Sequence, residues 1–145
     1  MFYSRYCEYV IRALSYLSQY QQENKYIMAR EVADKTGIPY HFLSKIFQDL
    51  TTTRWVQSKK GKNGGFMLAA DGSSLSLLEI IKWSDGIHNF NQCILGDKVC
   101  GEDFECSVHR KCCRLRLEIA DFFEKMTIGE FSEIRSETLG QKQLN

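Results

Sequence analysis

The spacing of apolar residues changes several times along the chain and predicts a series of short elements. Residues 3–20 carry apolar side chains mostly three or four positions apart, which is the spacing of an amphipathic helix. These side chains are Tyr6, Val10, Ala13, Leu14 and Leu17. A second helix is expected from about Ala29 to Lys35. It should end at Gly37, because glycine readily adopts the left-handed conformation that stops a helix.

A third helix is expected from Tyr40 to about Thr51, and Pro39 suits its start. Its buried face should carry Phe42 or Leu43, Ile46, Phe47 and Leu50. Two short helices joined by a turn that contains glycine are typical of a helix-turn-helix, whose second helix enters the DNA major groove. The side chains expected to face outward from that helix are Tyr40, His41, Ser44, Lys45 and Gln48.

Residues 55–69 predict a β-hairpin directly after the helix-turn-helix, which is the position of a wing. Two alternating stretches, 55–58 and 66–69, flank a glycine-rich basic turn that reads KKGKNGG. The glycines would let the backbone approach DNA phosphates, and the side chains expected to contact DNA are Lys59, Lys60, Lys62 and Asn63. The alternative is an enzyme's phosphate-binding loop. It is not favoured, because Gly64-Gly65 opens no helix and no lysine–serine pair follows.

The second half of the chain predicts two more helices around a cysteine-rich segment. A helix is expected from about Leu77 to Trp83, and a long helix over residues 109–126 carries a broad apolar face that needs a partner surface, plausibly the same helix of a second subunit. The tail beyond about Thr127 becomes polar and is expected to fray. The predicted fold is therefore mainly α with a small β-hairpin: a winged helix-turn-helix in residues 1–84, a cysteine-rich loop in 85–109, and a dimerisation helix and tail in 110–145.

The charge of the chain is unevenly distributed although its formal net value is only +1. Residues 1–82 hold 11 basic and 7 acidic side chains, whereas residues 83–145 hold 8 and 11. The basic excess is concentrated at Arg54 and the hairpin lysines, with no acid between Asp49 and Asp71. Such a patch is typical of a polyanion-binding surface, although a solvated loop would look the same. No signal peptide and no apolar run of about 18 residues is recognisable, so a soluble, cytoplasmic protein is expected.

The segment from Cys93 to His109 contains the candidate metal ligands. Cys93, Cys100 and Cys106 are separated by six and five residues, and His109 follows after two more. Thiolates are soft donors and imidazole is borderline, so the set suits zinc or an iron–sulfur cluster. Buried free thiols or disulfides are the alternatives. In a reducing compartment six cysteines indicate ligands or sensors rather than structural disulfides.

Taken together, these motifs resemble the IscR/NsrR-type family of bacterial winged-helix transcription regulators that carry iron–sulfur clusters. The likeness covers about residues 1–135 and rests on the helix-turn-helix at Ile38–Leu43, the wing at Ser58–Phe66, the three cysteines ending in Cys-x-x-His, and the box Thr127–Phe131. The chain departs from the family pattern at Lys60, where an arginine is usual, and at Cys112, where an aromatic is usual.

The resemblance implies a non-enzymatic regulator that binds a palindromic operator in double-stranded DNA as a homodimer and senses redox state, nitric oxide or cluster status. Cys93, Cys100 and Cys106 would ligate the cluster, with 2Fe–2S favoured and 4Fe–4S as the alternative. The fourth ligand would be His109 or, less favoured, Glu8. Cys7 is expected to pack as a small apolar side chain. Cys112 and Cys113 are expected to pack at the helix surface, with a role as spare ligands as the alternative. The rival interpretations are a cluster-free winged-helix regulator with a thiol switch or zinc site, and a small iron–sulfur electron carrier.

Overall fold

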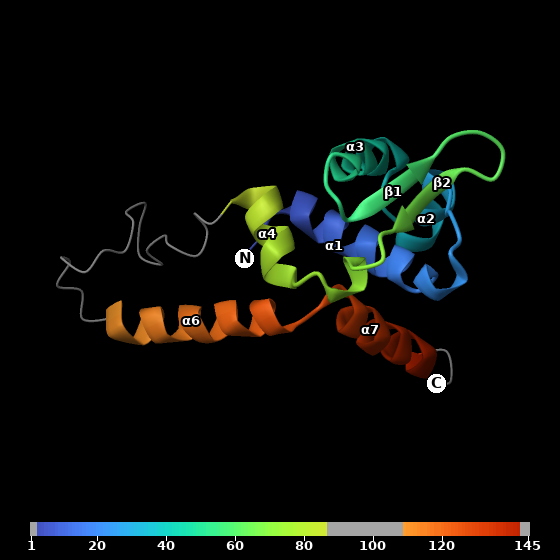
Figure 1. The fold of residues 1–145 in the computed structure, drawn as a ribbon. Helices are drawn as coiled ribbons and strands as arrows, with labels where there is room; N and C mark the ends of the chain where they lie inside the picture. The colour runs from blue at the N-terminus through green and yellow to red at the C-terminus, as the bar shows by residue number, and fades with distance from the viewer. Residues whose placement is uncertain (1–2, 87–108, 143–145) are drawn as a thin grey trace.

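The computed structural model describes residues 3–86 and 109–142. Its elements, in chain order, are α1 (Arg5–Ser18), the 3-10 turn η1 (Gln21–Glu23), α2 (Ala29–Thr36), α3 (Tyr40–Thr51), β1 (Val56–Lys59), β2 (Gly65–Leu68), the 3-10 turn η2 (Gly72–Ser74), α4 (Leu77–Asp85), α6 (His109–Lys125) and α7 (Ile128–Lys142) (Figure 1). The expected fold class, mainly α with a small hairpin wing, is confirmed. None of the described helices is long and apolar enough to cross a membrane.

Helix α1 forms the centre of the molecule. Its N-cap is Ser4, whose hydroxyl accepts a hydrogen bond from the Cys7 backbone N–H at 3.1 Å. Of the apolar positions that define its helical spacing, Val10, Ala13, Leu14 and Leu17 are buried and Tyr6 is partly buried; Cys7 is buried among them. Burial raises the pKa of the Cys7 thiol to about 12, so this cysteine packs as a small apolar side chain, as the sequence predicts.

Helix α3 packs against α1 through one fully buried face, made of Leu43, Ile46, Phe47 and Leu50. Phe42 is 48% exposed, so of the two candidates for this face it is Leu43 that is buried. The Tyr6 hydroxyl on α1 donates to the Asp49 carboxylate on α3 at 2.6 Å. Burial and this carboxylate raise the pKa of Tyr6 above its usual range, so the hydroxyl stays protonated and keeps the bond.

The hairpin pairs β1 with β2 in antiparallel register, from Val56 opposite Leu68 to Lys59 opposite Gly65. An isolated bridge between Ile27 and Phe66 ties the segment before α2 to the hairpin. Gly65 has φ +145° at this crossing, and a Cβ there would lie 2.3 Å from the Ile27 carbonyl oxygen. A glycine is therefore required at position 65 for the wing to lie against the start of α2.

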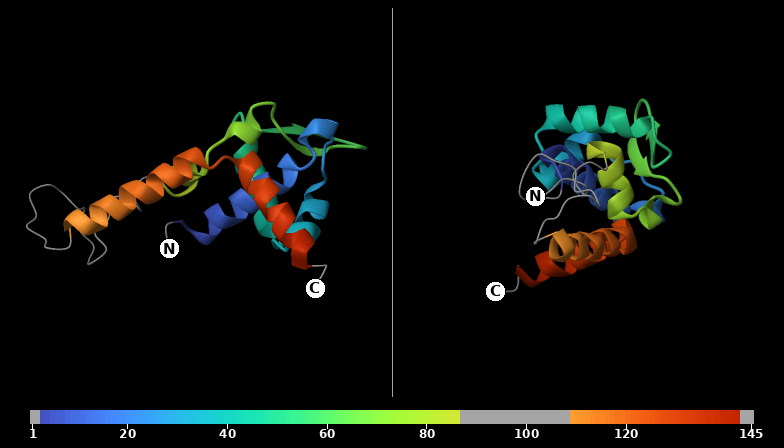
Figure 2. Two further views of the ribbon diagram at one scale, coloured as in Figure 1. Left: turned by 90° about the horizontal axis from the view of Figure 1, so that it is seen from below. Right: turned by 90° about the vertical axis from the view of Figure 1, so that its left-hand side faces the viewer.

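Helices α4 and α7 begin side by side, and each begins with a capping box. Ser76 with Glu79, and Thr127 with Glu130, exchange side-chain-to-backbone bonds of 3.0–3.2 Å. The two N-caps also pair as an isolated bridge between Ser76 and Thr127. This junction sets the direction of α6, whose N-terminal half projects from the body (Figure 2).

The expectation that the chain frays beyond Thr127 is wrong, because α7 is helical to Lys142 and packs along α1. Ile128 is fully buried, and the Ser132 hydroxyl donates to the Ser15 carbonyl at 3.0 Å. The polar composition of the tail led to the prediction of fraying, but a few buried contacts are enough to hold this helix against α1. Its start is already fixed by the capping box.

Replacing Thr127 with alanine removes the acceptor for the Glu130 N–H and should lower the free energy of unfolding by about 1 kcal/mol. Urea unfolding followed by circular dichroism measures this change. Ser136→Ala is the matched control, since the Ser136 hydroxyl donates to the Glu133 carbonyl on the exposed side of the same helix and caps no helix start. Equal losses in both variants would contradict a capping role for Thr127.

Candidate nucleic-acid interface

The turn between α2 and α3 positions the recognition helix. Helix α2 ends at Gly37, which has φ +69° and donates its N–H to the Ala33 carbonyl at 2.8 Å. Ile38 is buried directly after it, and Pro39 precedes the first residue of α3. The chain therefore enters α3 in a fixed direction, as the helix-turn-helix prediction requires.

The predicted DNA-contacting side chains of α3 share one side of the helix. Tyr40 is half exposed, His41 and Lys45 are exposed, and Ser44 is partly buried between them. With about 100° between successive residues, these four positions span less than half of the helix circumference. They lie opposite the buried face of α3, and the hairpin follows α3 and lies beside it (Figure 1).

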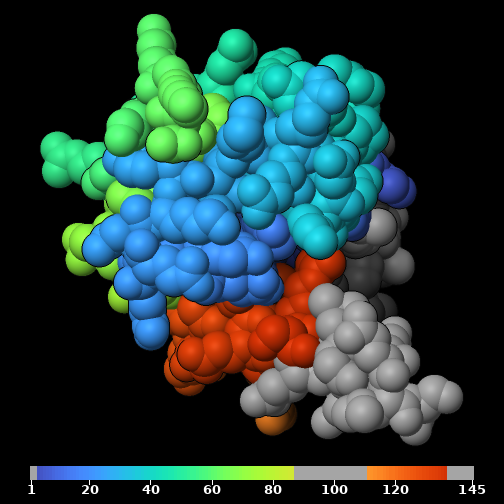
Figure 3. All heavy atoms as spheres, turned by 90° about the vertical axis from the view of Figure 1, so that its right-hand side faces the viewer, coloured from blue at the N-terminus to red at the C-terminus, as the bar shows by residue number. Residues whose placement is uncertain are grey.

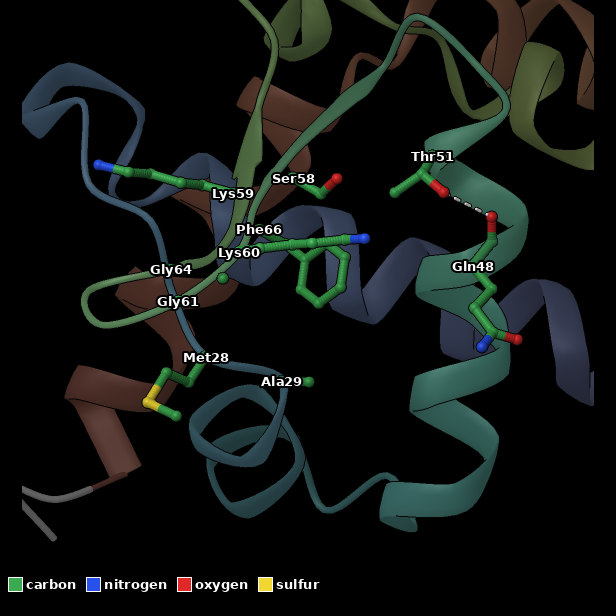
Figure 4. A pocket seen from close by; sticks show the side chains of 11 residues that line it. Met28, Ala29, Gln48, Thr51, Ser58, Lys59, Lys60, Gly61, Gly64 and Phe66 are labelled. Carbon is green, nitrogen blue, oxygen red and sulfur yellow. Dashed lines mark hydrogen bonds between the residues drawn. The ribbon is translucent and has the colours of Figure 1, made fainter.

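A groove of about 400 Å³ separates the hairpin from α3, and the start of α2 closes one end of it (Figure 4). Gln48 and Thr51 line it from α3, and Met28 and Ala29 line it from the start of α2. The Lys60 side chain extends across the groove toward α3, whereas Lys59 points away from it (Figure 4). The groove thus combines a cation, hydroxyls and amides between two elements that are expected to contact DNA.

The other wing residues lie at or near the tip of the hairpin. Lys62 and Asn63 are exposed in its turn, where Asn63 has φ 63° and Gly61 has φ +88°. Lys59 holds its ammonium nitrogen 5.7 Å from the centre of the Tyr26 ring. In the space-filling view the hairpin (green) projects beside the segment that leads into α2 (blue) (Figure 3). The structure therefore places the predicted wing residues together on one protrusion.

The cations of this surface are not neutralised by the described part of the chain. The ion pairs there join Arg12 to Glu8, Arg114 to Glu118, and Lys125 to Asp121, and none involves Lys45 or a wing lysine. Exposed lysines without a carboxylate partner can bind phosphates without first breaking an internal pair. The local patch, rather than the net charge of +1, is what makes this surface suited to DNA.

The predicted metal ligands are only partly covered by the structure. Cys93, Cys100 and Cys106 lie outside the described residues, and His109 is the first residue of α6. Within residues 3–86 and 109–142, no three His, Cys, Asp or Glu side chains form a metal-binding group. Cys112 and Cys113 are free, partly exposed thiols on α6.

The start of the cysteine-rich segment, residues 85–109, is held by a contact that the sequence did not reveal. Asp85, at the end of α4, accepts hydrogen bonds from the backbone N–H and the hydroxyl of Ser4, the N-cap of α1. The segment therefore begins beside the first turn of α1 and ends at the first residue of α6. Four residues after the cap, Glu8 is paired with Arg12 at 3.3 Å.

Arg12 connects this region to the helix-turn-helix. The same guanidinium that pairs with Glu8 also donates to the Thr36 carbonyl at the end of α2. Gly37 follows directly, and a Cβ there would lie 3.7 Å from the Arg12 side chain. The Arg12 side chain therefore connects Glu8, the alternative ligand, to the turn that positions α3.

Comparison with known proteins identifies the family. Residues 3–133 match the Rrf2 family, described as iron-dependent transcriptional regulators. An HTH-type transcriptional regulator of Aquifex aeolicus is 31% identical over 96% of both chains. IscR of Vibrio campbellii is 27% identical over 84% of this chain and 71% of its own.

A solved structure supports the same fold. CymR of B. subtilis, named as a global cysteine regulator, superposes with a TM-score of 0.74 at 19% identity, covering 90% of this chain and 95% of its own. The resemblance to IscR-type regulators is therefore confirmed at the level of family and fold. The chain belongs to the Rrf2 family of DNA-binding transcriptional regulators, which are not enzymes.

Proposed function

We propose that this regulator controls its DNA affinity through an iron–sulfur cluster bound in residues 85–109. Cys93, Cys100 and Cys106 would hold it, with His109 as the fourth ligand and Glu8 as the alternative. The donor set fits, because three thiolates and one nitrogen or oxygen ligand suit a 2Fe–2S centre, or a 4Fe–4S centre with the carboxylate. When bound, the cluster supplies a centre that reacts with oxidants and nitric oxide.

The observation that carries this proposal is how the ends of the segment are attached. Asp85 holds one end to Ser4 at the start of α1, and the other end continues directly into α6 through His109. A change in the ordering of the segment therefore acts on both α1 and α6. Since α1 packs against both helices of the helix-turn-helix, it would also act on the DNA-binding unit, residues 1–84.

Arg12 offers a second route within one subunit. Glu8 and the Thr36 carbonyl share the Arg12 guanidinium, each bound by a different terminal nitrogen. When Glu8 is drawn toward a ligand position, Arg12 can bind Thr36 without it and so alter the turn before α3. A hundredfold change in DNA affinity needs only about 2.7 kcal/mol of difference between two such arrangements, which is within reach of one charge-assisted contact.

Helix α6 supports assembly as a homodimer. Leu115, Leu117 and Phe122 are 53–66% exposed, which is unusual for three large apolar side chains on one helix. The helix also carries its charge unevenly. Its first half holds Arg110, Lys111, Arg114 and Arg116, and its second half holds Glu118, Asp121 and Glu124 with one lysine, Lys125. Two copies packed antiparallel would cover Leu115 and Phe122, which lie about 20° apart around the helix, and bring opposite charges together.

A dimer also explains how one recognition helix per chain reads DNA. Two α3 helices related by a two-fold axis would reach half-sites of a palindromic operator about one helical turn apart. Tyr40, His41, Ser44 and Lys45 would face base edges or phosphates, and the wing lysines would hold the backbone. Because the half-site spacing is fixed by the DNA, a small movement of α1 against α6 changes the fit of both halves.

Replacing Lys60 with alanine should weaken binding to duplex DNA of any sequence and reduce the slope of log affinity against log salt by about one unit. Fluorescence anisotropy at several salt concentrations measures both quantities. Lys82→Ala on α4 is the control, because it removes the same charge from an exposed position away from the wing. If the salt slopes of Lys60→Ala and Lys82→Ala are equal, Lys60 does not contact a DNA phosphate.

Protein purified without oxygen should show visible absorption bands and about two irons and two sulfides per chain. Cys100→Ser should lose them, whereas Cys112→Ser should keep them. His109→Ala should lose more iron than Glu8→Ala, and the reverse order would identify Glu8 as the ligand. If the protein contains zinc but no iron or sulfide, even after cluster reconstitution, the cluster proposal is wrong. The remaining interpretation is a cluster-free regulator with a thiol switch or a zinc site.

Replacing Leu115 with glutamate should convert the dimer to a monomer, because each copy would bury a charge in the shared apolar face. Sedimentation equilibrium measures the mass directly. Lys125→Ala, at the end of the same helix and paired with Asp121 within one chain, should leave the dimer intact. If the Leu115→Glu protein remains dimeric and folded, the interface lies elsewhere.

A further inference from the structure

Arg30, at the edge of the proposed DNA-binding surface, is not among the contacts predicted above, and its side chain lies against Tyr40. Arg30 is the second residue of α2, and its guanidinium carbon lies 5.5 Å from the centre of the Tyr40 ring. Tyr40 is the first residue of α3 and is 50% exposed. The contact therefore joins the first helix of the helix-turn-helix to the start of the second, at the surface.

The charge of Arg30 is available to a ligand. In the described part of the chain no carboxylate lies within ion-pair distance of it, since the three ion pairs there involve other residues. The neighbouring Glu31 carboxylate accepts a hydrogen bond from the Tyr16 hydroxyl at 3.3 Å. Stacking on Tyr40 occupies one face of the guanidinium and leaves its N–H edge free to donate.

The position of Arg30 indicates the ligand. It follows Met28 and Ala29, which line the end of the groove between the hairpin and α3. In a helix-turn-helix the first helix crosses the DNA backbone while the start of the second reads base edges. A planar, bidentate donor at the start of the first helix is suited to a phosphate oxygen pair.

We infer that Arg30 is a phosphate-binding residue of this regulator and that Tyr40 acts chiefly as its positioning residue. The inference rests on the proposed DNA-binding mode and adds α2 to the two elements that sequence analysis predicted to contact DNA. Tyr40 fixes the guanidinium against α3, so the phosphate contact sets the distance of the recognition helix from the backbone. Arg30 contributes affinity without sequence preference.

The test uses the full-length protein and a fluorescent mixed-sequence DNA duplex, titrated at several salt concentrations. Arg30→Ala should reduce the salt slope by about 0.9 unit and weaken binding roughly fivefold near 0.1 M salt. Arg30→Lys should keep the slope but bind more weakly than the wild type, since lysine is not bidentate. Lys35→Ala is the control, because this exposed cation lies on the same helix roughly 140° around from Arg30.

Tyr40 variants test the positioning role. Tyr40→Phe keeps the ring and should keep the salt slope of the wild type, whereas Tyr40→Ala should lose part of the salt slope that Arg30→Ala loses. The double variant Arg30→Ala/Tyr40→Ala should have the same salt slope as Arg30→Ala alone. Additive losses of salt slope, or an unchanged salt slope in Arg30→Ala, would overturn the inference. Failure of the wild type to bind the duplex would instead overturn the proposed DNA-binding mode.

Discussion

The buried face of α1 is the constraint on which the rest of the structure depends. Helices α2, α3, α4 and α7 all pack against this one helix, and so does β2 of the wing. Its large apolar side chains are almost fully buried, so the helix cannot shift without disturbing several interfaces at once. A change in the contacts of the first turn of α1 is therefore transmitted by packing to α2, α3 and the hairpin, although α1 itself is not expected to contact DNA.

Three hydrogen bonds connect α1 to the start of the cysteine-rich segment and to the two helices of the helix-turn-helix. Ser4 attaches its first turn to Asp85, Tyr6 attaches it to Asp49 on α3, and Arg12 attaches it to Thr36 at the end of α2. The first of these lies at the start of the cysteine-rich segment, and the other two lie at the ends of the two helices of the helix-turn-helix. A sensor built into this segment needs no long chain of intermediates, because one rigid element connects both sites.

The elements that depend on local sequence were predictable, and those that depend on distant contacts were not. The start of α3 at Tyr40 follows from Pro39 and from the apolar spacing of the helix, and the hairpin follows from its glycines and alternating strands. The bridge from Ile27 to Phe66 joins residues 39 positions apart, and nothing in the local pattern of either segment indicates it. That bridge is what brings Met28 and Ala29 to the groove between the hairpin and α3. For this reason the start of α2 could not be predicted as part of the proposed interface.

The residues of the candidate site were likewise predictable only where a short stretch of sequence carries the signal. Lys59, Lys60 and Lys62 stood out because charge and glycine content are readable in one short stretch. Arg30 did not, since its significance comes from the Tyr40 ring, ten residues later. Charge and stacking together explain how a chain with a net charge of +1 can bind a polyanion. Lys59 and Arg30, which lie against the rings of Tyr26 and Tyr40, would lose little freedom on binding, so each would contribute more affinity than a mobile surface lysine.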